Sequence, residues 1–187
     1  MKAALAIVAA LLAVAGNVPY LQQTWKGRVK PHPYTWLVGS IVSGTVLLGM
    51  LDKGAGIGSL PVAVSEAFTI VIFLFSLKFG FTKITRSDKL FLALALAGLI
   101  PWFVTKDPTL SVVVAVGVDL LSLVPTFRKS WKYPQTESPI LFGSNVLRHI
   151  LALASLQTYN VATTLHSIAM IISNTALVAV ISRKKAR

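Results

Sequence analysis

Uncharged stretches of ten or more residues follow one another along the chain, and short segments that carry most of the charges separate them. A helix rises about 1.5 Å per residue, so about 20 apolar residues cross the roughly 30 Å hydrocarbon core of a bilayer. The pattern therefore predicts membrane-spanning helices rather than a water-soluble core. We predict seven of them, at residues 3–25, 33–51, 56–78, 89–105, 108–127, 138–158 and 161–182.

The composition agrees with this interpretation. Of the 187 residues, 55% are hydrophobic and 13% are charged, whereas a soluble domain carries roughly 25% charged residues. We predict an all-α polytopic integral membrane protein, with the plasma (inner) membrane as its location. The chain has no cysteine, which excludes disulfides and thiolate metal sites. Its three histidines lack the paired spacing of a metal site, so we expect neither a metal nor a cofactor.

The basic residues are distributed unevenly between the two ends of the predicted helices. One end collects 14 Lys and Arg residues and the other collects three, while Arg148 falls inside a helix. Basic loops stay in the cytoplasm, so we predict an external N-terminus and a cytoplasmic C-terminus. The net charge of +12 is then explained by orientation and by contacts with lipid headgroups. No nucleic-acid-binding motif accompanies it, and we expect no nucleic-acid partner.

The first apolar stretch allows one alternative. Lys2 and the apolar run after it resemble a signal peptide, with Ala13-Val14-Ala15 as a cleavage site. Cleavage would place the basic segment 26–30 outside, against the charge distribution, so we favour a retained helix.

A short motif occurs twice. Residues 17–26 read NVPYLQQTWK and residues 123–132 read LVPTFRKSWK. Four pairs of identical residues lie 106 positions apart: Pro19 and Pro125, Trp25 and Trp131, Lys26 and Lys132, and Pro33 and Pro139. We predict two copies of a three-helix unit, at 1–80 and 107–187, with a linker helix within 81–106. The added helix makes the copies parallel, a known carrier design.

This arrangement resembles the PQ-loop and SWEET transporter superfamily, which has seven helices in a three-one-three order and an external N-terminus. The family has a proline near the cytoplasmic end of helices 1 and 5, which Pro19 and Pro125 match. The residue after that proline is typically Gln or Asn in the family, whereas here it is Tyr20 and Thr126. The resemblance implies that prolines on helices 1, 2, 5 and 6 form the inner gate, here Pro19, Pro33, Pro125 and Pro139.

The prolines also have a physical interpretation of their own. A proline inside a helix lacks an N–H and displaces the carbonyl four residues earlier, which is that of Ala15 for Pro19 and that of Leu121 for Pro125. Two matched kinks favour hinges at the cytoplasmic end. A static bend is the alternative, because prolines are common in membrane helices. Pro33 and Pro139 also suit the first turn of a helix.

Three charged residues fall within the predicted spans: Glu66, Asp119 and Arg148. A charge at a helix centre costs at least about 2.5–3.5 kcal/mol on insertion scales, so such residues face the bundle interior or a pathway and have partners. Two acids compete for one arginine. Asp119 and Arg148 could form a buried pair that only fixes packing, and the remaining acid could then serve a proton, a cationic solute or His149.

Glu66 is the sharper candidate for a binding or coupling residue. Its counterpart in the second unit is Asn174, and in SWEET proteins a pair of asparagines on helices 3 and 7 faces the sugar. The resemblance thus implies a site at Asn174 and Glu66. A carboxylate accepts hydrogen bonds from sugar hydroxyls, and it also suits proton coupling. Asn145, on the same predicted helix as Arg148, completes the candidate set.

These observations predict a non-enzymatic carrier that moves a small polar solute by alternating access, with a sugar first and an amino acid second, with or without a coupled proton. A membrane enzyme using Asp119 and His149 is a weaker alternative, because no catalytic motif is present. A seven-helix cargo receptor of the same fold is the stronger one, in which Arg148 would bind a peptide carboxylate without solute flux. A homo-oligomer stays open, although two units in one chain remove the need for a dimer.

Overall fold

The computed structural model describes residues 1–98, 104 and 107–185, and the regular elements in that part of the chain are all helical. The α-helices are α1 (Lys2–Trp25), α2 (Pro33–Asp52), α3 (Leu60–Phe79), α4 (Arg86–Gly98), α6 (Pro108–Lys132), α7 (Pro139–Ser155) and α8 (Val161–Lys185). Two short 3-10 helices, η1 (Gly56–Ser59) and η2 (Pro134–Thr136), precede α3 and α7. Residues 99–103 and 105 of the predicted helix 89–105 lie outside the described residues.

Five of the described helical segments are long and apolar enough to cross a membrane. They are Lys2–Trp25, Pro33–Asp52, Gly56–Phe79, Thr109–Lys132 and Val161–Ser182. The helix α7, which carries Arg148, has 17 residues and rises about 25 Å, so it is shorter than these five segments. The described part of α4 has 13 residues. The described residues therefore confirm the all-helical architecture, and five of the predicted spans are helices with the length and apolar character that crossing a membrane requires.

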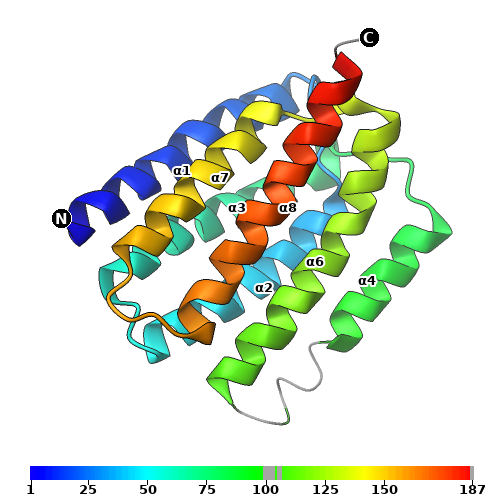
Figure 1. Ribbon diagram of the computed structural model, residues 1–187. Coiled ribbons are helices and arrows are strands. Elements are labelled where there is room, and N and C mark those ends of the chain that lie inside the picture. The colour runs from blue at the N-terminus through cyan, green and yellow to red at the C-terminus, as the bar shows by residue number, and fades with distance from the viewer. Residues whose placement is uncertain (99–103, 105–106, 186–187) are drawn as a thin grey trace.

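The helices form one bundle in which neighbours in space are often distant in sequence (Figure 1). The helix α1 packs mainly against α7 and α3, while α2 packs mainly against α6 and α3. The helix α8 packs against both α6 and α7. At one edge of the bundle, α4 lies along α6 (Figure 1). The contacts of α1 with α7 and of α2 with α6 therefore join the first half of the chain to the second half.

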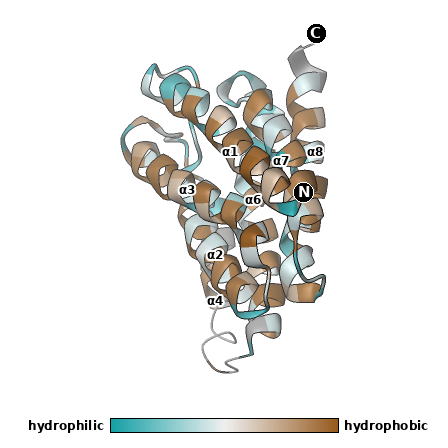
Figure 2. Ribbon diagram, turned by 90° about the vertical axis from the view of Figure 1, so that its left-hand side faces the viewer, coloured by the Kyte–Doolittle hydropathy of each residue, from teal (hydrophilic) through white to brown (hydrophobic). Residues whose placement is uncertain are grey.

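Apolar side chains cover much of the outside of the bundle. Leu11, Leu74 and Ile172 are more than half exposed, and hydrophobic residues run along the helices while the connecting loops are more hydrophilic (Figure 2). A soluble monomer rarely exposes so large an apolar surface. The buried core is also apolar, and its main cluster includes Val38, Val42 and Val112. The polar residues inside the bundle therefore have mostly apolar surroundings.

Two helices continue past the prolines that interrupt them. The helix α1 contains Pro19 and ends at Trp25, and α6 contains Pro125 and ends at Lys132. The predicted end of the fifth helix at residue 127 is therefore wrong. A single proline removes one hydrogen bond and displaces one carbonyl, and the turns on either side remain helical. By contrast, Pro33 and Pro139 are the first residues of α2 and α7, where a proline is tolerated.

Other helix ends also differ from the prediction: α3 begins at Leu60 and not at residue 56, and α8 ends at Lys185 and not at residue 182. The helix α4 begins at Arg86, before the predicted residue 89, because Thr85 and Asp88 form a capping box. The Thr85 amide donates to the Asp88 carboxylate at 2.7 Å, and the Asp88 amide donates to the Thr85 hydroxyl at 3.3 Å. The helix α7 ends at Ser155, before residue 158, because Leu156 is extended and the Gln157 amide donates instead to the Ala55 carbonyl at 3.4 Å.

Candidate functional site

A cavity of about 100 Å³ that is lined mostly by polar residue types lies within the bundle. Residues of six helices line it, α1, α2, α3, α6, α7 and α8, and no residue of α4 is among them in the described part of the chain. We call it the central cavity. Its lining residues are Asn17, Thr35, Trp36, Gly39, Ser43, Ser65, Thr69, Asp119, Leu123, Thr126, Phe142, Asn145, Arg148, His149, His166, Met170 and Asn174.

Helical spacing brings the lining residues of each helix onto one face. On α7, Asn145, Arg148 and His149 are spaced i, i+3 and i+4, and residues so spaced are neighbours on a helix surface. On α8, His166 and Asn174 lie two turns apart on the same face. The sequence places these residues on shared faces, but the packing of the helices decides that the faces meet.

Four of the five predicted site residues line the central cavity: Asn145, Arg148, Asp119 and Asn174. Their role in binding stays a prediction. Glu66 does not line the cavity, although its sequence neighbour Ser65 does. Glu66 is partly buried, and its Oε2 atom is buried without a hydrogen-bond partner in the described residues.

Arg148 is buried, with 4% of its surface exposed. Its Nε atom donates to Asn145 Oδ1 at 3.3 Å, its Nη1 atom contacts the Pro61 carbonyl at 3.5 Å, and its Nη2 atom lies 2.7 Å from His149 Nε2. A guanidinium only donates, so His149 Nε2 accepts. The proton of a neutral His149 then lies on Nδ1, which is 3.2 Å from the Ser167 hydroxyl. Each of these partners is uncharged.

Asp119 has a different partner from the one that the sequence suggested. Its Oδ2 atom lies 3.6 Å from His166 Nε2, and its Oδ1 atom lies 3.4 Å from the Ser122 hydroxyl. The rings of His166 and His149 meet edge to face, with 5.4 Å between their centroids. Asp119 and Arg148 therefore do not form the buried packing pair that we considered, and two histidines lie between their neighbourhoods.

The residue that follows each internal proline forms a contact near the same end of the bundle. The Thr126 hydroxyl donates to the Thr35 hydroxyl at 2.9 Å, and Thr35 donates to the Ser122 carbonyl at 2.7 Å. The Tyr20 hydroxyl donates to Glu137 Oε2 at 3.1 Å. Thr126 thus ties α6 to α2, and Tyr20 ties α1 to the segment before α7. Both contacts join the first part of the chain to the last.

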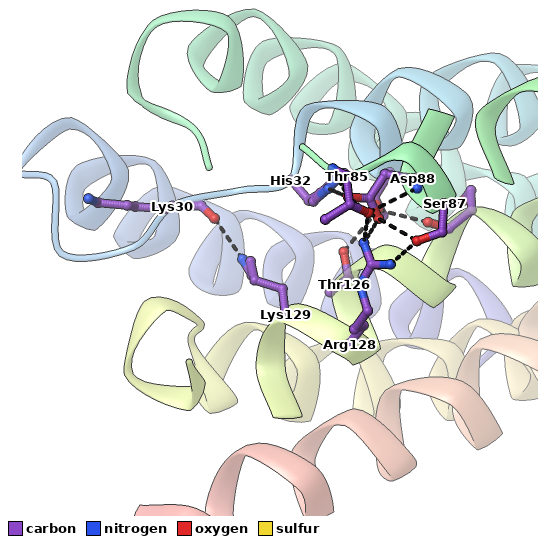
Figure 3. Close-up of polar contacts among 10 residues, drawn as sticks. Lys30, His32, Thr85, Ser87, Asp88, Thr126, Arg128 and Lys129 are labelled. Atoms are coloured by element: carbon purple, nitrogen blue, oxygen red, sulfur yellow. Dashed lines mark hydrogen bonds and ion pairs between the residues drawn. The ribbon is translucent and has the colours of Figure 1, made fainter. Parts of the chain in front are cut away.

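A second polar cluster closes this end of the bundle, which we call the basic end (residues 26–32, 80–88 and 128–138). The Arg128 guanidinium forms an ion pair with Asp88 and also donates to the hydroxyls of Thr85 and Ser87 (Figure 3). Asp88 is fully buried, and it also holds the first turn of α4 through the capping box. The pair therefore fastens α4 to the end of α6.

A second buried ion pair lies at the basic end. Lys129 pairs with Glu137, and both side chains are 1% exposed. The Lys129 ammonium also donates to the Lys30 carbonyl at 2.6 Å (Figure 3). Glu137 in turn accepts from Tyr20. Lys129 and Glu137 thus connect three segments: the end of α1, the end of α6 and the residues before α7.

His32 lies between these clusters, just before α2. Its Nε2 atom is 3.7 Å from Asp88 Oδ2, and the residue is 1% exposed. Burial lowers the pKa of His32 from 6.5 to about 4, and the nearby cations Lys129 and Arg128 act in the same direction. Asp88 opposes the shift but does not outweigh burial. His32 is therefore neutral at pH 7 and adds no charge to the cluster.

Sequence reasoning missed the basic-end cluster and did not single out His166 as a candidate. The pattern Thr85-x-x-Asp88 is a capping signal and could have shown that Asp88 has a structural role. Gly39 and Ser43 on α2, which were not among the predicted site residues, also line the central cavity. Among the described residues, no three His, Cys, Asp or Glu side chains are grouped as a metal site would require.

Comparisons with protein-family models, with curated proteins and with solved structures gave no match for this chain.

Proposed function

We propose that this protein is a membrane carrier that moves a small polar solute through the central cavity by alternating access. The observation that carries the proposal is the position of the cavity. Residues from α1, α2 and α3 form one side and residues from α6, α7 and α8 form the other. Carriers built from two repeats bind solute at the interface between the repeats, near the middle of the membrane.

The pattern of helix contacts supports two related units. In the first, α3 packs against both α1 and α2, and in the second, α8 packs against both α6 and α7. Between the units, the first helix of each unit packs against the second helix of the other: α1 packs against α7, and α6 packs against α2. Lys2 and Pro108, which begin α1 and α6, are again 106 positions apart, as are Pro33 and Pro139. We propose a linker role for α4, an external N-terminus and a cytoplasmic basic end.

The contacts at the basic end support a gate. Pro19 and Pro125 each lie next to a residue that bonds to the other half of the chain, Tyr20 to Glu137 and Thr126 to Thr35. Opening on this side would require these hydrogen bonds, and the hydrogen bond of the Lys129 ammonium to the Lys30 carbonyl, to break. The prolines lack the N–H that would hold the turn rigid, so bending at Pro19 and Pro125, near the starts of α2 and α7 at Pro33 and Pro139, is the motion we propose.

A cargo or ligand receptor of the same fold remains the second candidate, because Arg148 is a cationic group inside a cavity and could bind a carboxylate without transporting it. The two candidates differ in flux. Purified protein in proteoliposomes should take up a labelled solute from a panel of hexoses, disaccharides and amino acids if it is a carrier. Binding without uptake into the vesicles would instead favour the receptor.

The same assay tests coupling. Glu66 has a buried oxygen without a partner in the described residues, so it is the acid that we propose for proton coupling. An inward proton gradient should accelerate uptake by the wild type, and Glu66→Gln should abolish that acceleration. Gradient-independent uptake that survives Glu66→Gln would instead identify a facilitator and leave Glu66 with a packing role.

A further inference from the structure

We propose that the central cavity holds its solute through a carboxylate group, and that the guanidinium of Arg148 is the group that binds it. The inference rests on the proposed carrier function and names the class of solute that its site would take. It follows from the state of Arg148, which is buried and charged but has no anionic partner within the described chain.

The protein does not supply a carboxylate to Arg148. All six Asp and Glu side chains lie in the part of the chain that the structure describes, and the structure accounts for each of them elsewhere. Asp52 pairs with Lys53, Asp88 with Arg128 and Glu137 with Lys129, Asp119 lies beside His166, Asp107 caps α6, and Glu66 has no ion pair among the described residues. A buried guanidinium stays charged, so its counter-charge has to come from outside the chain.

The guanidinium keeps unused donors. It has five N–H groups, and the described contacts use three of them, on Asn145, on the Pro61 carbonyl and on His149. The contact with Pro61, at 3.5 Å, is at the long limit of a hydrogen bond. At least two donors are therefore left on a side chain that lines the cavity. Paired N–H donors in a rigid plane match the two oxygens of a carboxylate.

The charges of the lining favour a solute with one carboxylate group. Arg148 is the only Lys or Arg among the described lining residues and Asp119 the only acid, so one positive and one negative formal charge face the cavity. A monocarboxylate, or an amino acid whose ammonium lies toward Asp119, suits this balance. A phosphate dianion would place two negative charges near Asp119 with one cation to offset them. A neutral sugar would leave the buried guanidinium without a counter-charge.

Two neighbours orient Arg148. Asn145 accepts from Nε and His149 accepts from Nη2, and both residues are one turn or less away on α7. They hold the guanidinium plane in place while leaving its remaining donors free. We regard Asn145 and His149 as positioning residues, and their loss should weaken carboxylate binding without creating affinity for uncharged solutes.

The test compares solutes that differ only at the carboxyl group. The full chain in detergent is titrated with lactate and lactamide, with alanine and alaninamide, and with glucose, and binding is read by calorimetry. At least one carboxylate should bind, and its amide should bind at least about 30-fold more weakly, as expected when a buried charged partner is lost. Arg148→Gln should remove this preference, and Arg148→Lys should keep part of it because the charge remains but the planar fork does not.

Controls separate binding from folding. Arg28→Gln makes the same change in charge at an exposed loop residue and should leave the preference unchanged. If Arg148→Gln does not fold, Asn145→Leu serves instead and should reduce carboxylate affinity several-fold. The preference of the wild type for a carboxylate over its amide tests the proposal without any variant.

The outcomes also separate this inference from the carrier function. Uptake of glucose into proteoliposomes without carboxylate binding would overturn the inference and leave the carrier standing. Carboxylate binding without uptake would support the inference and overturn the carrier in favour of the receptor. Equal binding of acid and amide, binding that survives Arg148→Gln, or no binding of any carboxylate in the panel would show that Arg148 is not a carboxylate site.

Discussion

The basic end and the central cavity both bury charged side chains, but the partners of these side chains differ. At the basic end, Lys129 meets Glu137 and Asp88 meets Arg128, so the buried charges of Lys129, Glu137 and Asp88 each have an opposite charge and further hydrogen bonds. In the central cavity, the partners of Arg148 among the described residues are all neutral groups. Burying an unpaired charge is costly, so a protein keeps one where a ligand can compensate it.

The comparison suggests how to distinguish structural charges from functional ones in a membrane protein. A satisfied pair that links segments distant in sequence, such as Asp88 and Arg128, stabilises a particular arrangement of helices. A buried cation without an anion, such as Arg148, marks a place where something else binds. Burial alone does not separate the two cases, because Lys129 and Arg148 are both nearly inaccessible.

The largest effect is expected when one member of a buried pair is removed. Lys129→Met should lower the free energy of unfolding by about 3–5 kcal/mol, because Glu137 is left charged and buried. Denaturant unfolding in detergent measures the loss. The double variant Lys129→Met, Glu137→Leu should recover much of the stability, and Lys26→Met, at an exposed position, should change little. A small loss of stability in Lys129→Met would mean that the pair of Lys129 and Glu137 does not stabilise the fold.

A smaller effect is expected from pH, through His32. Its pKa falls from 6.5 to about 4 on folding, so between these values the unfolded chain binds a proton that the native protein does not. Stability should therefore be highest above pH 6.5 and decrease by up to about 3 kcal/mol as the pH falls to 4. Thermal unfolding of the wild type and of His32→Asn should differ in slope across this window. Parallel pH profiles would show that His32 is not buried in a neutral form.

Glycines in the two regions should respond unequally to an added methyl group. A Cβ atom at Gly80 would lie 2.7 Å from the Pro31 carbonyl oxygen and would also clash with the Ser76 carbonyl, so Gly80→Ala should cost about 2 kcal/mol. At Gly39 it would meet Thr69 at 3.7 Å and Asp119 at 4.0 Å, which is ordinary contact. Gly39→Ala should therefore keep the midpoint of unfolding while reducing solute affinity. Equal losses of stability would contradict this contrast.

The smallest effect on stability is expected in the central cavity itself. Arg148→Met removes a buried charge that has no anionic partner in the described chain, so the free energy of unfolding should change by less than about 1 kcal/mol or increase. The same unfolding experiment measures it, with Lys129→Met as the matched comparison. A loss as large as that of Lys129→Met would mean that Arg148 stabilises the fold through a pairing that the structure does not contain.

Much of the architecture could be predicted from local pattern. Seven helices were expected, and the described helices occupy all seven positions, because long uncharged stretches allow little else in a bilayer. The errors lie at helix ends. The fifth helix was predicted to end at residue 127 but continues to Lys132, and the capping box of Thr85 and Asp88 was overlooked. These errors arise because the end of a helix depends on a few local hydrogen bonds, whereas its existence depends on about 20 residues.

The candidate site was only partly predictable. The unusual position of Asp119 and Arg148 inside apolar helices marked them as interior residues, and both line the central cavity. The partners of these two residues could not be predicted from the sequence. Asp119 was considered as a partner of Arg148, but it lies beside His166. Glu66 is not among the residues that line the central cavity.

The sequence by itself determined that this is an all-helical chain with apolar spans, one basic end, matched prolines at Pro19 and Pro125, and three charges within the predicted spans. Only the tertiary structure decided which of those charges meet. Periodicity along one helix states which residues share a face, but the rotation and register of α6, α7 and α8 against one another depend on packing between distant segments. That packing placed His166 beside Asp119 and left Arg148 in the cavity without an acid from the described chain.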